Sequence, residues 1–157
     1  MKGFEIMFPE IREITVENKQ QALQLKVATT QQDYVETVEE CLSEAREDTR
    51  YMPVGLYDNN TMVGFAMYGR FVEDNVERIW FDRYLIDEHY QGKGYGKYFM
   101  QQVLAFLTEK YHCQKIYLSV YDNNTFAIHL YEKMGFHFNG ELDIHGEKVM
   151  VREQLIS

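Results

Sequence analysis

The spacing of hydrophobic positions changes several times along the 157-residue chain, and each change predicts an element. Apolar residues three and four apart predict helices, whereas alternating or short continuous apolar runs predict strands. Helices are predicted from Thr15 to about Leu25, over Gln31–Glu47, from about Gly94 to Tyr111, and over Thr125–Met134. Strands are predicted over Glu10–Thr15, Val54–Tyr57, Met62–Phe71, Arg78–Ile86, Lys115–Val120, Phe138–Ile144 and Lys148–Val151.

Turn and capping residues mark where these elements begin and end. Thr15 is placed to cap the first helix, Asp58–Thr61 supplies turn residues, Gly135 stops the last helix, and His145-Gly146 signals a hairpin turn. The resulting order is β-α-α-β-β-β-α-β-α-β-β. Because no repeat or linker interrupts it, we expect one α+β domain over residues 1–157. Its sheet is expected to be mixed and mostly antiparallel, with six or seven strands flanked by about four helices.

The net charge of the chain, −9 at pH 7, limits the classes of partner. Nucleic acid is not expected, because binding its phosphates needs a basic face. A small cationic molecule is compatible with the charge, since acidic surfaces attract cations. No apolar run approaches the roughly 18–20 residues of a membrane span, and the N-terminal residues interleave charged with apolar positions. We therefore expect no signal peptide, no membrane anchor and a cytoplasmic location.

Cysteine and histidine usage argues against disulfides and metals. Cys41 and Cys113 lack the CxxC spacing and are expected to be small core residues. The five histidines show no HExxH or other ligand spacing, so no metal site is expected.

The glycine-rich segment Gln91–Gly96 (QGKGYG) lies between a predicted strand and a predicted helix. Glycines there permit positive φ angles and leave backbone N–H groups uncovered at a helix N-terminus, which favours a phosphate or pyrophosphate. The Walker A pattern is excluded because Tyr98 follows Gly96-Lys97, and the dinucleotide pattern is excluded because the glycines run GxGxG. On its own the segment is either an anion site or a glycine-rich turn without a ligand.

Two motifs together resemble a known family. Gln91–Gly96, following the strand WFDRYLID, resembles the acetyl-CoA loop of the GCN5-related N-acetyltransferases (GNAT). Asn124–Phe136, in the pattern NxxAxxxYxxxGF, resembles the downstream helix of that family. The stretches PVGLY, VGFAMYG and FNGELDIHGEKVMV are similar to the spermine/spermidine (diamine) acetyltransferases of bacilli. The resemblance implies a GNAT-like acyl-CoA acyltransferase fold, acetyl-CoA as co-substrate, a polyamine as acceptor, and a homodimer.

The resemblance also implies a set of cofactor contacts. Backbone amides of the loop would bind the pyrophosphate, and the backbone of the preceding strand would hold the pantetheine arm and polarise the thioester carbonyl. The residues implied are Leu85, Ile86, Gln91, Gly92, Lys93, Gly94, Tyr95, Gly96, Lys97, Asn124 and Tyr131. Ordinary sheet pairing is the alternative for the two strand residues, and helix capping is the alternative for Asn124.

Two residues are expected to carry the proton transfers. Tyr131 matches the family tyrosine that protonates the departing CoA thiolate; its alternative is a place in the core. Asp82 is the candidate base, because a carboxylate in an otherwise apolar strand is costly unless it is used or paired. Its alternative is an ion pair with Arg78 or Arg83.

A polyamine carries ammonium groups separated by methylenes, so its site is expected to combine carboxylates with aromatic walls. Tyr34, Glu36, Trp80, Asp82 and Tyr84 are the expected contacts. Two other functions remain open at this stage. One is acetylation of another amine, such as an aminoglycoside, an amino acid or a protein N-terminus; the other is a non-catalytic module that senses acyl-CoA.

Overall fold

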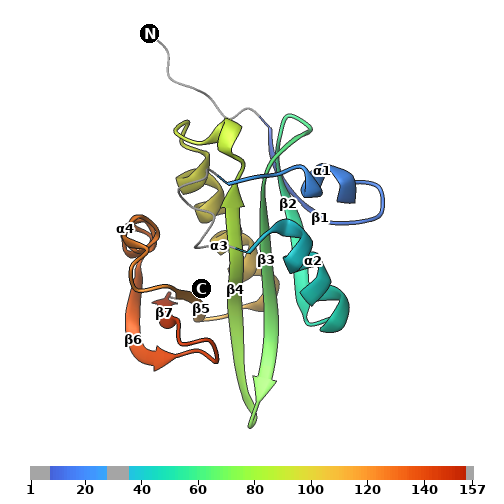
Figure 1. Ribbon diagram of the computed structural model, residues 1–157. Helices are drawn as coiled ribbons and strands as arrows, with labels where there is room; N and C mark the ends of the chain where they lie inside the picture. Colours follow the sequence, from blue (N-terminus) through green and yellow to red (C-terminus); the bar gives the residue numbers. More distant parts are fainter. Residues whose placement is uncertain (1–7, 28–35, 155–157) are drawn as a thin grey trace. The chain divides into compact units, whose positions relative to one another are not determined.

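The computed structural model describes residues 8–27 and 36–154 (Figure 1). Its elements are, in chain order, β1 (Pro9–Glu13), α1 (Lys19–Leu23), α2 (Val38–Glu47), β2 (Tyr51–Asp58), β3 (Thr61–Glu73), β4 (Val76–Ile86), the short 3₁₀ helix η2 (Glu88–Tyr90), α3 (Tyr95–Tyr111), β5 (Lys115–Val120), α4 (Thr125–Lys133), β6 (Phe136–Leu142) and β7 (Lys148–Glu153). The predicted order of strands and longer helices is confirmed.

The strands form one seven-stranded sheet in the order β1-β2-β3-β4-β5-β7-β6. Strands β4 and β5 are parallel, whereas the pairs β1–β2, β5–β7 and β6–β7 are antiparallel. The α+β class and the mixed, mostly antiparallel sheet are therefore confirmed. Strand β5 pairs with β7 along its whole length, while its register with β4 joins Ile79 to Ile116 and Trp80 to Tyr117.

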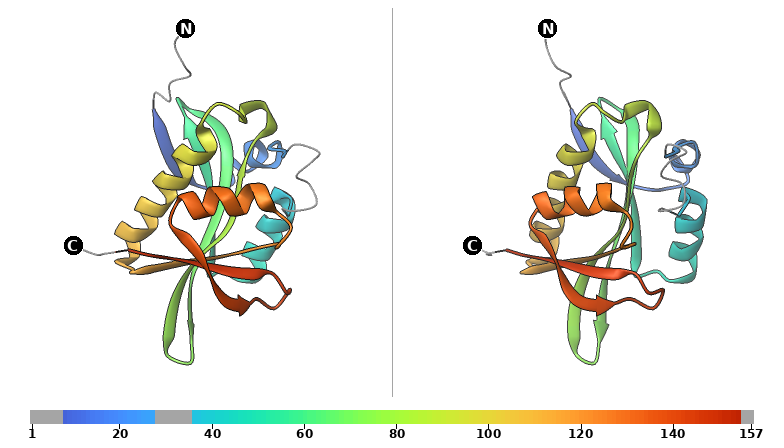
Figure 2. Two further views of the ribbon diagram at one scale, coloured as in Figure 1. Left: turned by 90° about the vertical axis from the view of Figure 1, so that its left-hand side faces the viewer. Right: turned by 60° about the vertical axis from the view of Figure 1, so that its left-hand side comes forward.

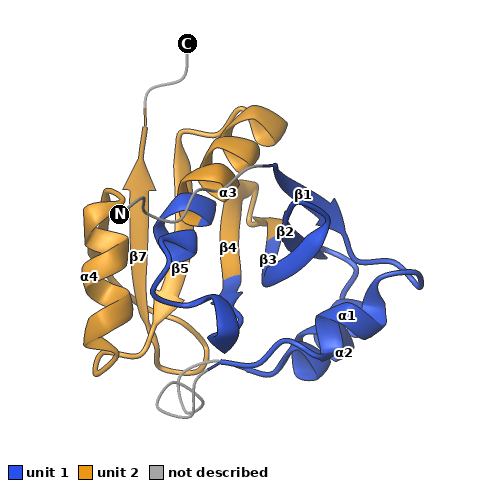
Figure 3. Ribbon diagram, turned by 90° about the horizontal axis from the view of Figure 1, so that it is seen from above, with its two compact units in different colours: residues 1–68, 83–99 blue, residues 69–82, 100–157 orange. Residues whose placement is uncertain are grey.

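The chain divides into two compact units, each built from discontinuous segments (Figure 3). One unit contains the described residues up to Tyr68 together with Arg83–Phe99. The other contains Gly69–Asp82 and the described residues from Met100 onward. Strands β3 and β4 therefore contribute to both units. The single domain expected over residues 1–157 stays a prediction.

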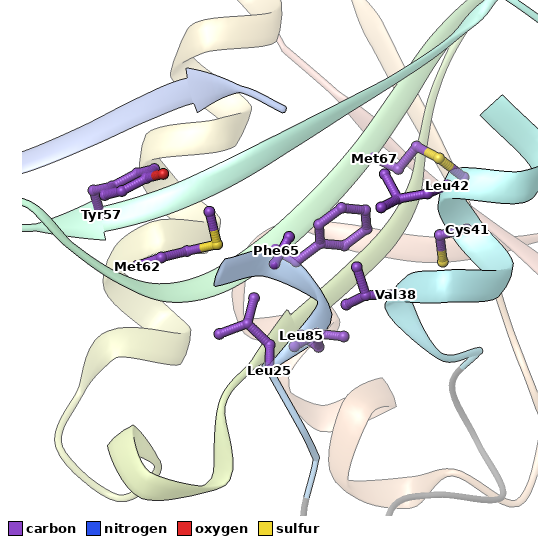
Figure 4. Packing of buried hydrophobic residues seen from close by; sticks show 10 residues of the cluster. Leu25, Val38, Cys41, Leu42, Tyr57, Met62, Phe65, Met67 and Leu85 are labelled. Carbon is purple, nitrogen blue, oxygen red and sulfur yellow. The ribbon is translucent and has the colours of Figure 1, made fainter. Parts of the chain in front are cut away.

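A cluster of apolar side chains forms the core of the first unit (Figure 4). Val38, Cys41 and Leu42 recur at helical spacing on one face of α2 and pack toward Phe65 of β3. Leu85 of β4 joins the same cluster. The spacing that predicted α2 as a helix is thus the spacing that buries it.

The starts of the first two helices differ from the sequence prediction. The first helix begins at Lys19, because the N–H of Thr15 donates to Asn18 Oδ1 at 2.7 Å and forms a turn where a helix was expected. The described part of the second helix begins at Val38, where Thr37 and Glu40 form a capping box. Residues 31–35 of the predicted helix lie outside the described residues.

The second unit contains most of α3 and the segment from β5 to β7, with α4 lying against β6 (Figure 2). The predicted hairpin turn between β6 and β7 is confirmed. Asp143 Oδ1 accepts the backbone N–H groups of His145 and Glu147, and Gly146 has a φ angle of 81°. Cys113 in the second unit and Cys41 in the first are buried thiols that form no disulfide, as expected of small core residues. Within residues 8–27 and 36–154, no helix is long and apolar enough to cross a membrane.

Candidate active site

The loop Gln91–Gly96 links η2 to α3, and its glycines leave the backbone uncovered. Gly92 and Gly94 have φ angles of 77° and 88°, in the left-handed region that favours glycine. A Cβ atom built on either of them, or on Gly96, would meet no described atom within 4 Å. The helical hydrogen bonds begin with Tyr98 N donating to Gly94 O at 3.2 Å. The N–H groups that precede this bond are those a helix leaves for an anion, so the loop has the geometry to hold a phosphate group.

Side-chain hydrogen bonds hold the loop at both ends. Gln91 Nε2 donates to the carbonyl of Ile86 at 3.0 Å, and the hydroxyl of Tyr84 donates to the carbonyl of Gly96 at 2.5 Å. The buried hydroxyl of Tyr95 donates to Oδ2 of the buried Asp58 at 2.7 Å. Burial, reinforced by the Asp58 carboxylate, raises the pKa of Tyr95, so this phenol keeps its proton and remains a donor.

Asp87 fixes the turn between β4 and the loop, although only 4% of its surface is exposed. Its Oδ1 accepts the backbone N–H of His89 at 2.9 Å and lies 2.7 Å from His89 Nδ1, while Oδ2 accepts the N–H of Lys26 at 2.9 Å. Burial by itself raises the pKa of this carboxyl group, but the Lys26 and His89 interactions together lower it below its ordinary value. Asp87 is therefore an ionised structural anchor.

Leu85 and Ile86 direct their backbone groups to opposite edges of β4. A Cβ atom on Gly64 would lie 2.6 Å from the carbonyl oxygen of Leu85, and the N–H of Asp87 donates to Val63 O at 2.9 Å. The polar groups of Leu85 therefore face β3. Because this direction alternates along a strand, the N–H and C=O of Ile86 face the other edge.

Trp80 and Asp82 are half-buried on β4 within the second unit. The indole ring of Trp80 lies against the ring of Tyr117, with 5.4 Å between centroids and an angle of 39°. Oδ2 of Asp82 is shielded from solvent. An aromatic wall and a carboxylate, both expected at the acceptor site, thus lie two residues apart on one face of the strand.

The two arginines considered as partners of Asp82 have other carboxylates beside them. Arg78 donates two hydrogen bonds of 2.9 Å to Glu141. In the first unit, Arg83 Nε lies 2.8 Å from Glu36 Oε2, and its Nη2 lies 3.5 Å from Glu44 Oε1. The carboxylate of Glu36, expected to bind an ammonium group of the acceptor, is thus already next to a guanidinium.

Four further predicted contacts are Tyr34, Lys93, Lys97 and Tyr84. Tyr34 lies outside the described residues. Lys93 and Lys97 are exposed, and the ammonium of Lys93 lies 5.8 Å from the centroid of the Tyr90 ring. Tyr84, expected in the acceptor site, makes the hydrogen bond to Gly96 described above.

Asn124 and Tyr131 lie on α4 in the second unit. Asn124 is the N-cap of the helix, and its side chain accepts from the N–H of Ala127 at 3.4 Å. Helix capping was the alternative role predicted for this residue. The half-buried ring of Tyr131 packs edge-on against Phe136, with 6.0 Å between centroids. Desolvation, with a smaller contribution from the charge of Glu147, raises the pKa of Tyr131 to about 12.

The second unit also has an open groove of about 530 Å³ between α3, the end of α4 and β7. Its polar lining includes Thr108, Glu109, Lys133, Arg152 and Gln154. None of the predicted site residues lines it. Within the part of the chain that the structure describes, no group of three His, Cys, Asp or Glu side chains is arranged to hold a metal ion.

Several supporting residues were missed in the sequence analysis. Asp58, Asp87 and the hydroxyl of Tyr84 hold the loop through contacts that depend on the folded chain. The role of Asp87 could have been predicted from the sequence, because an Asp at the end of an apolar strand, directly before a turn, is a typical cap. The contact between Asp58 and Tyr95 joins residues 37 positions apart and has no local signal.

Known proteins resemble this chain over most of its length. Residues 8–136 match the acetyltransferase (GNAT) family. The spermine/spermidine N(1)-acetyltransferase of Bacillus subtilis (strain 168) is 50% identical over 147 residues, which cover 91% of this chain and 97% of the relative. The ribosomal protein bS18-alanine N-acetyltransferase of Haemophilus influenzae is 35% identical over 95 residues, covering 60% of this chain and 59% of the relative.

A solved structure shows the same fold. The spermidine N-acetyltransferase from Vibrio cholerae, in complex with CoA and spermine, aligns with a TM-score of 0.70 at 21% identity, over 93% of this chain and 95% of that chain. The family match spans most of the chain and includes both the loop and α4, so the resemblance inferred from these two motifs is confirmed. The chain belongs to the GNAT acetyltransferase family.

Proposed function

We propose that the protein transfers an acetyl group from acetyl-CoA to a primary amine of spermidine or spermine. The observation that carries this proposal is the 50% identity to the Bacillus spermine/spermidine N(1)-acetyltransferase over nearly the full length of both chains. The open glycine loop and the half-buried carboxylate of Asp82 on β4 support it, because the reaction needs an anion cradle and a proton acceptor.

The loop residues and Ile86 fit the expected co-substrate. Acetyl-CoA supplies the acetyl group as an activated thioester. The uncovered amides from Gln91 to Lys97 bind its pyrophosphate, with the exposed ammonium groups of Lys93 and Lys97 adding positive charge. Ile86 offers an N–H on the edge of β4 that does not face β3, and this group binds the pantetheine arm or the thioester carbonyl. Leu85 supports that strand through its pairing with β3, and Asn124 contributes both its capping bond and a contact to the pantetheine.

Asp82 and Tyr131 carry the proton transfers in the proposed reaction. Asp82 takes a proton from the acceptor ammonium, directly or through a water molecule, because a primary amine is mostly protonated at neutral pH. The amine nitrogen then bonds to the acetyl carbon as the carbon–sulfur bond breaks, and the new amide nitrogen loses its second proton to solvent, which later restores the phenol of Tyr131. Tyr131 gives its proton to the sulfur, and the raised pKa of the phenol keeps that proton available throughout the neutral range.

The acceptor contacts are proposed from the same family resemblance. Trp80 supplies an aromatic wall next to Asp82, and Tyr34, Glu36 and Tyr84 are the further contacts. The carboxylate of Glu36 lies beside the guanidinium of Arg83, so it attracts an ammonium group of the acceptor less strongly than a lone carboxylate would. The homodimer remains a prediction, which the molar mass in solution, measured by light scattering, would test.

A second acceptor class has its own support. The Haemophilus relative acts, by its name, on an alanine of ribosomal protein bS18, and it matches 60% of this chain. A peptide amine is therefore the alternative acceptor. The non-catalytic sensor would bind acetyl-CoA and release no CoA thiol with any amine.

The deciding experiment compares kcat/KM across an amine panel, measured by release of the CoA thiol. We expect spermidine and spermine to exceed kanamycin, free amino acids and an alanine-initiated peptide by at least tenfold. Asp82→Asn serves as the matched control for enzyme-dependent release, since it removes the proposed base and preserves the shape of the side chain. Equal or better turnover of the peptide would overturn the polyamine assignment, and thiol release at background for every amine would favour the sensor.

A further inference from the structure

Three polar or aromatic side chains share one face of β4 within the second unit. Arg78, Trp80 and Asp82 are separated by two residues each, so strand alternation places them in a row on the same side. Four residues of strand correspond to about 13 Å between the first and the last. The row therefore begins at the proposed base and ends at a guanidinium.

The guanidinium of Arg78, at the end of this row opposite Asp82, is held in place by its neighbours. The guanidinium of Arg78 lies 4.4 Å from the centroid of the Tyr117 ring, and Tyr117 is the residue that pairs with Trp80 across the strands. Glu141 of β6 holds the same guanidinium through two hydrogen bonds of 2.9 Å. Asn139 Nδ2 donates to Glu141 at 2.8 Å and orients its carboxylate.

An aromatic face combined with a carboxylate is the chemistry that binds alkylammonium groups. In this unit Tyr117 and Glu141 provide both parts, and the guanidinium of Arg78 occupies the place that an ammonium would take. The ion pair is partly open to water, because the side chains of Arg78 and Glu141 are 30% and 44% exposed. The cation is therefore within reach of a ligand that runs along the strand.

We propose that Arg78 is a specificity-determining residue, which fills the cation site of Tyr117 and Glu141 and so disfavours acceptors long enough to bring a further ammonium there. This inference rests on the proposed function, because it assumes that the acceptor nitrogen reacts at Asp82. Spermine, which is longer than putrescine, meets the Arg78 charge, whereas putrescine ends before it. Like charges brought together at this site oppose binding, and the effect is limited by screening from water.

The test is the ratio of kcat/KM for spermine to that for putrescine in Arg78→Gln. Glutamine removes the charge but keeps a polar side chain, and it leaves Glu141 and the Tyr117 ring available to an ammonium. We expect the ratio to rise roughly three- to tenfold, the size of one partly screened charge interaction. The KM for acetyl-CoA should be unchanged. Glu141→Gln should shift the ratio in the opposite direction, because the guanidinium then lacks its carboxylate.

Arg70→Gln is the matched control, because Arg70 of β3 also pairs with a glutamate, Glu77 of β4, at 2.8 Å. It should leave the ratio unchanged. Equal shifts in Arg70→Gln and Arg78→Gln, or a change in Arg78→Gln by one common factor for all amines, would overturn the inference. Arg78→Lys retains the charge and should keep the ratio close to that of the parent protein, which provides a folded comparison if the glutamine variant is unstable.

A binding measurement separates this inference from the proposed function. The rise in unfolding temperature caused by spermine, relative to that caused by putrescine, needs no acetyl transfer. If no polyamine is acetylated but Arg78→Gln still increases the relative effect of spermine, the acceptor assignment fails and the cation site stands. If polyamines are acetylated and neither readout changes in Arg78→Gln, the inference about Arg78 fails alone.

Discussion

At the scale of single residues, Tyr131 shows how burial changes what a side chain can do. Desolvation raises the pKa of its phenol to about 12, well above the roughly 8.5 of a free thiol. Complete proton transfer to a thiolate in water would thus be uphill. A buried thiolate has its own pKa raised by the same loss of solvent, so in the proposed reaction the phenol donates its proton as negative charge builds on the sulfur.

Tyr131→Phe tests this role, because it removes the hydroxyl and keeps the ring that packs on Phe136. We expect kcat to fall roughly 10- to 100-fold, the low end for a positioned acid, since a thiolate is a fair leaving group without help. The KM for acetyl-CoA should change little. Because the acid keeps its proton below its raised pKa, ionisation of Tyr131 should not lower kcat between pH 7 and about 10.

Two results would contradict that account. A large loss of acetyl-CoA binding in Tyr131→Phe would show that the hydroxyl serves packing or binding. A fall in kcat of the parent protein with an apparent pKa below 10, absent from the phenylalanine variant, would show that the phenol ionises far more easily than its buried surroundings allow. Both are measured from kcat profiles over pH.

At the scale of elements, local patterns predicted what local forces determine. The strand β5 has the predicted bounds, and α3 ends at Tyr111 as expected, because their apolar spacing alone decides which face is buried. The start of α1 was wrong, since Asn18 also donates from Nδ2 to Glu13 O and to the hydroxyl of Tyr57, residues outside the helix. A tertiary contact of this kind cannot be seen in a window of neighbouring residues.

In the candidate site, too, the features with a local sequence pattern were predicted and those that depend on tertiary contacts were not. The glycine loop was recognised because its proposed anion site depends on backbone conformation, which the positions of glycines indicate directly. The residues that hold the loop in place were missed, because the hydrogen bonds from Tyr84 to Gly96 and from Tyr95 to Asp58 join separate elements. The alternatives for Asp82 were framed around Arg78 and Arg83 because they are neighbours in sequence, whereas the carboxylates beside these arginines come from other elements.

Gly64 and Gly96 offer a matched test of structural and functional glycines. A Cβ on Gly64 would lie 2.6 Å from Leu85 O and 2.9 Å from Ile86 Cδ1, so β3 and β4 would have to separate. We expect Gly64→Ala to lower the free energy of unfolding by about 1–3 kcal/mol, the usual effect of overpacking, as measured by urea denaturation.

Gly96→Ala should behave in the opposite way. Its Cβ meets no described atom within 4 Å, and alanine favours the first turn of α3, so stability should be unchanged or slightly higher. The KM for acetyl-CoA should rise at least tenfold, because the new methyl group occupies space in front of the loop. Unchanged acetyl-CoA affinity in Gly96→Ala would show that the open space beside this glycine is not used by the co-substrate.

At the scale of the whole molecule, the charge of −9 is relevant because the two proposed substrates have opposite charges. The field of an acidic protein attracts a polyamine and repels acetyl-CoA, and salt weakens both effects. The glycine loop, the helix N-terminus and the lysines beside it supply a local positive potential where the overall field is unfavourable. The net effect of the overall field and the local positive potential can therefore be measured for each substrate separately, from the way its kinetic constants change with salt.

Raising the ionic strength from about 0.05 to 0.3 M should lower kcat/KM for spermine by roughly three- to tenfold. The fall for putrescine should be smaller, since it carries fewer ammonium groups and each contributes to the attraction. The KM for acetyl-CoA should stay constant or decrease, because salt also screens its repulsion from the acidic surface. A neutral osmolyte at matched osmolarity is the control for general effects on the protein. Equal salt slopes for spermine and putrescine would show that the attraction does not increase with the number of ammonium groups, and that selectivity between polyamines arises from contacts within the site.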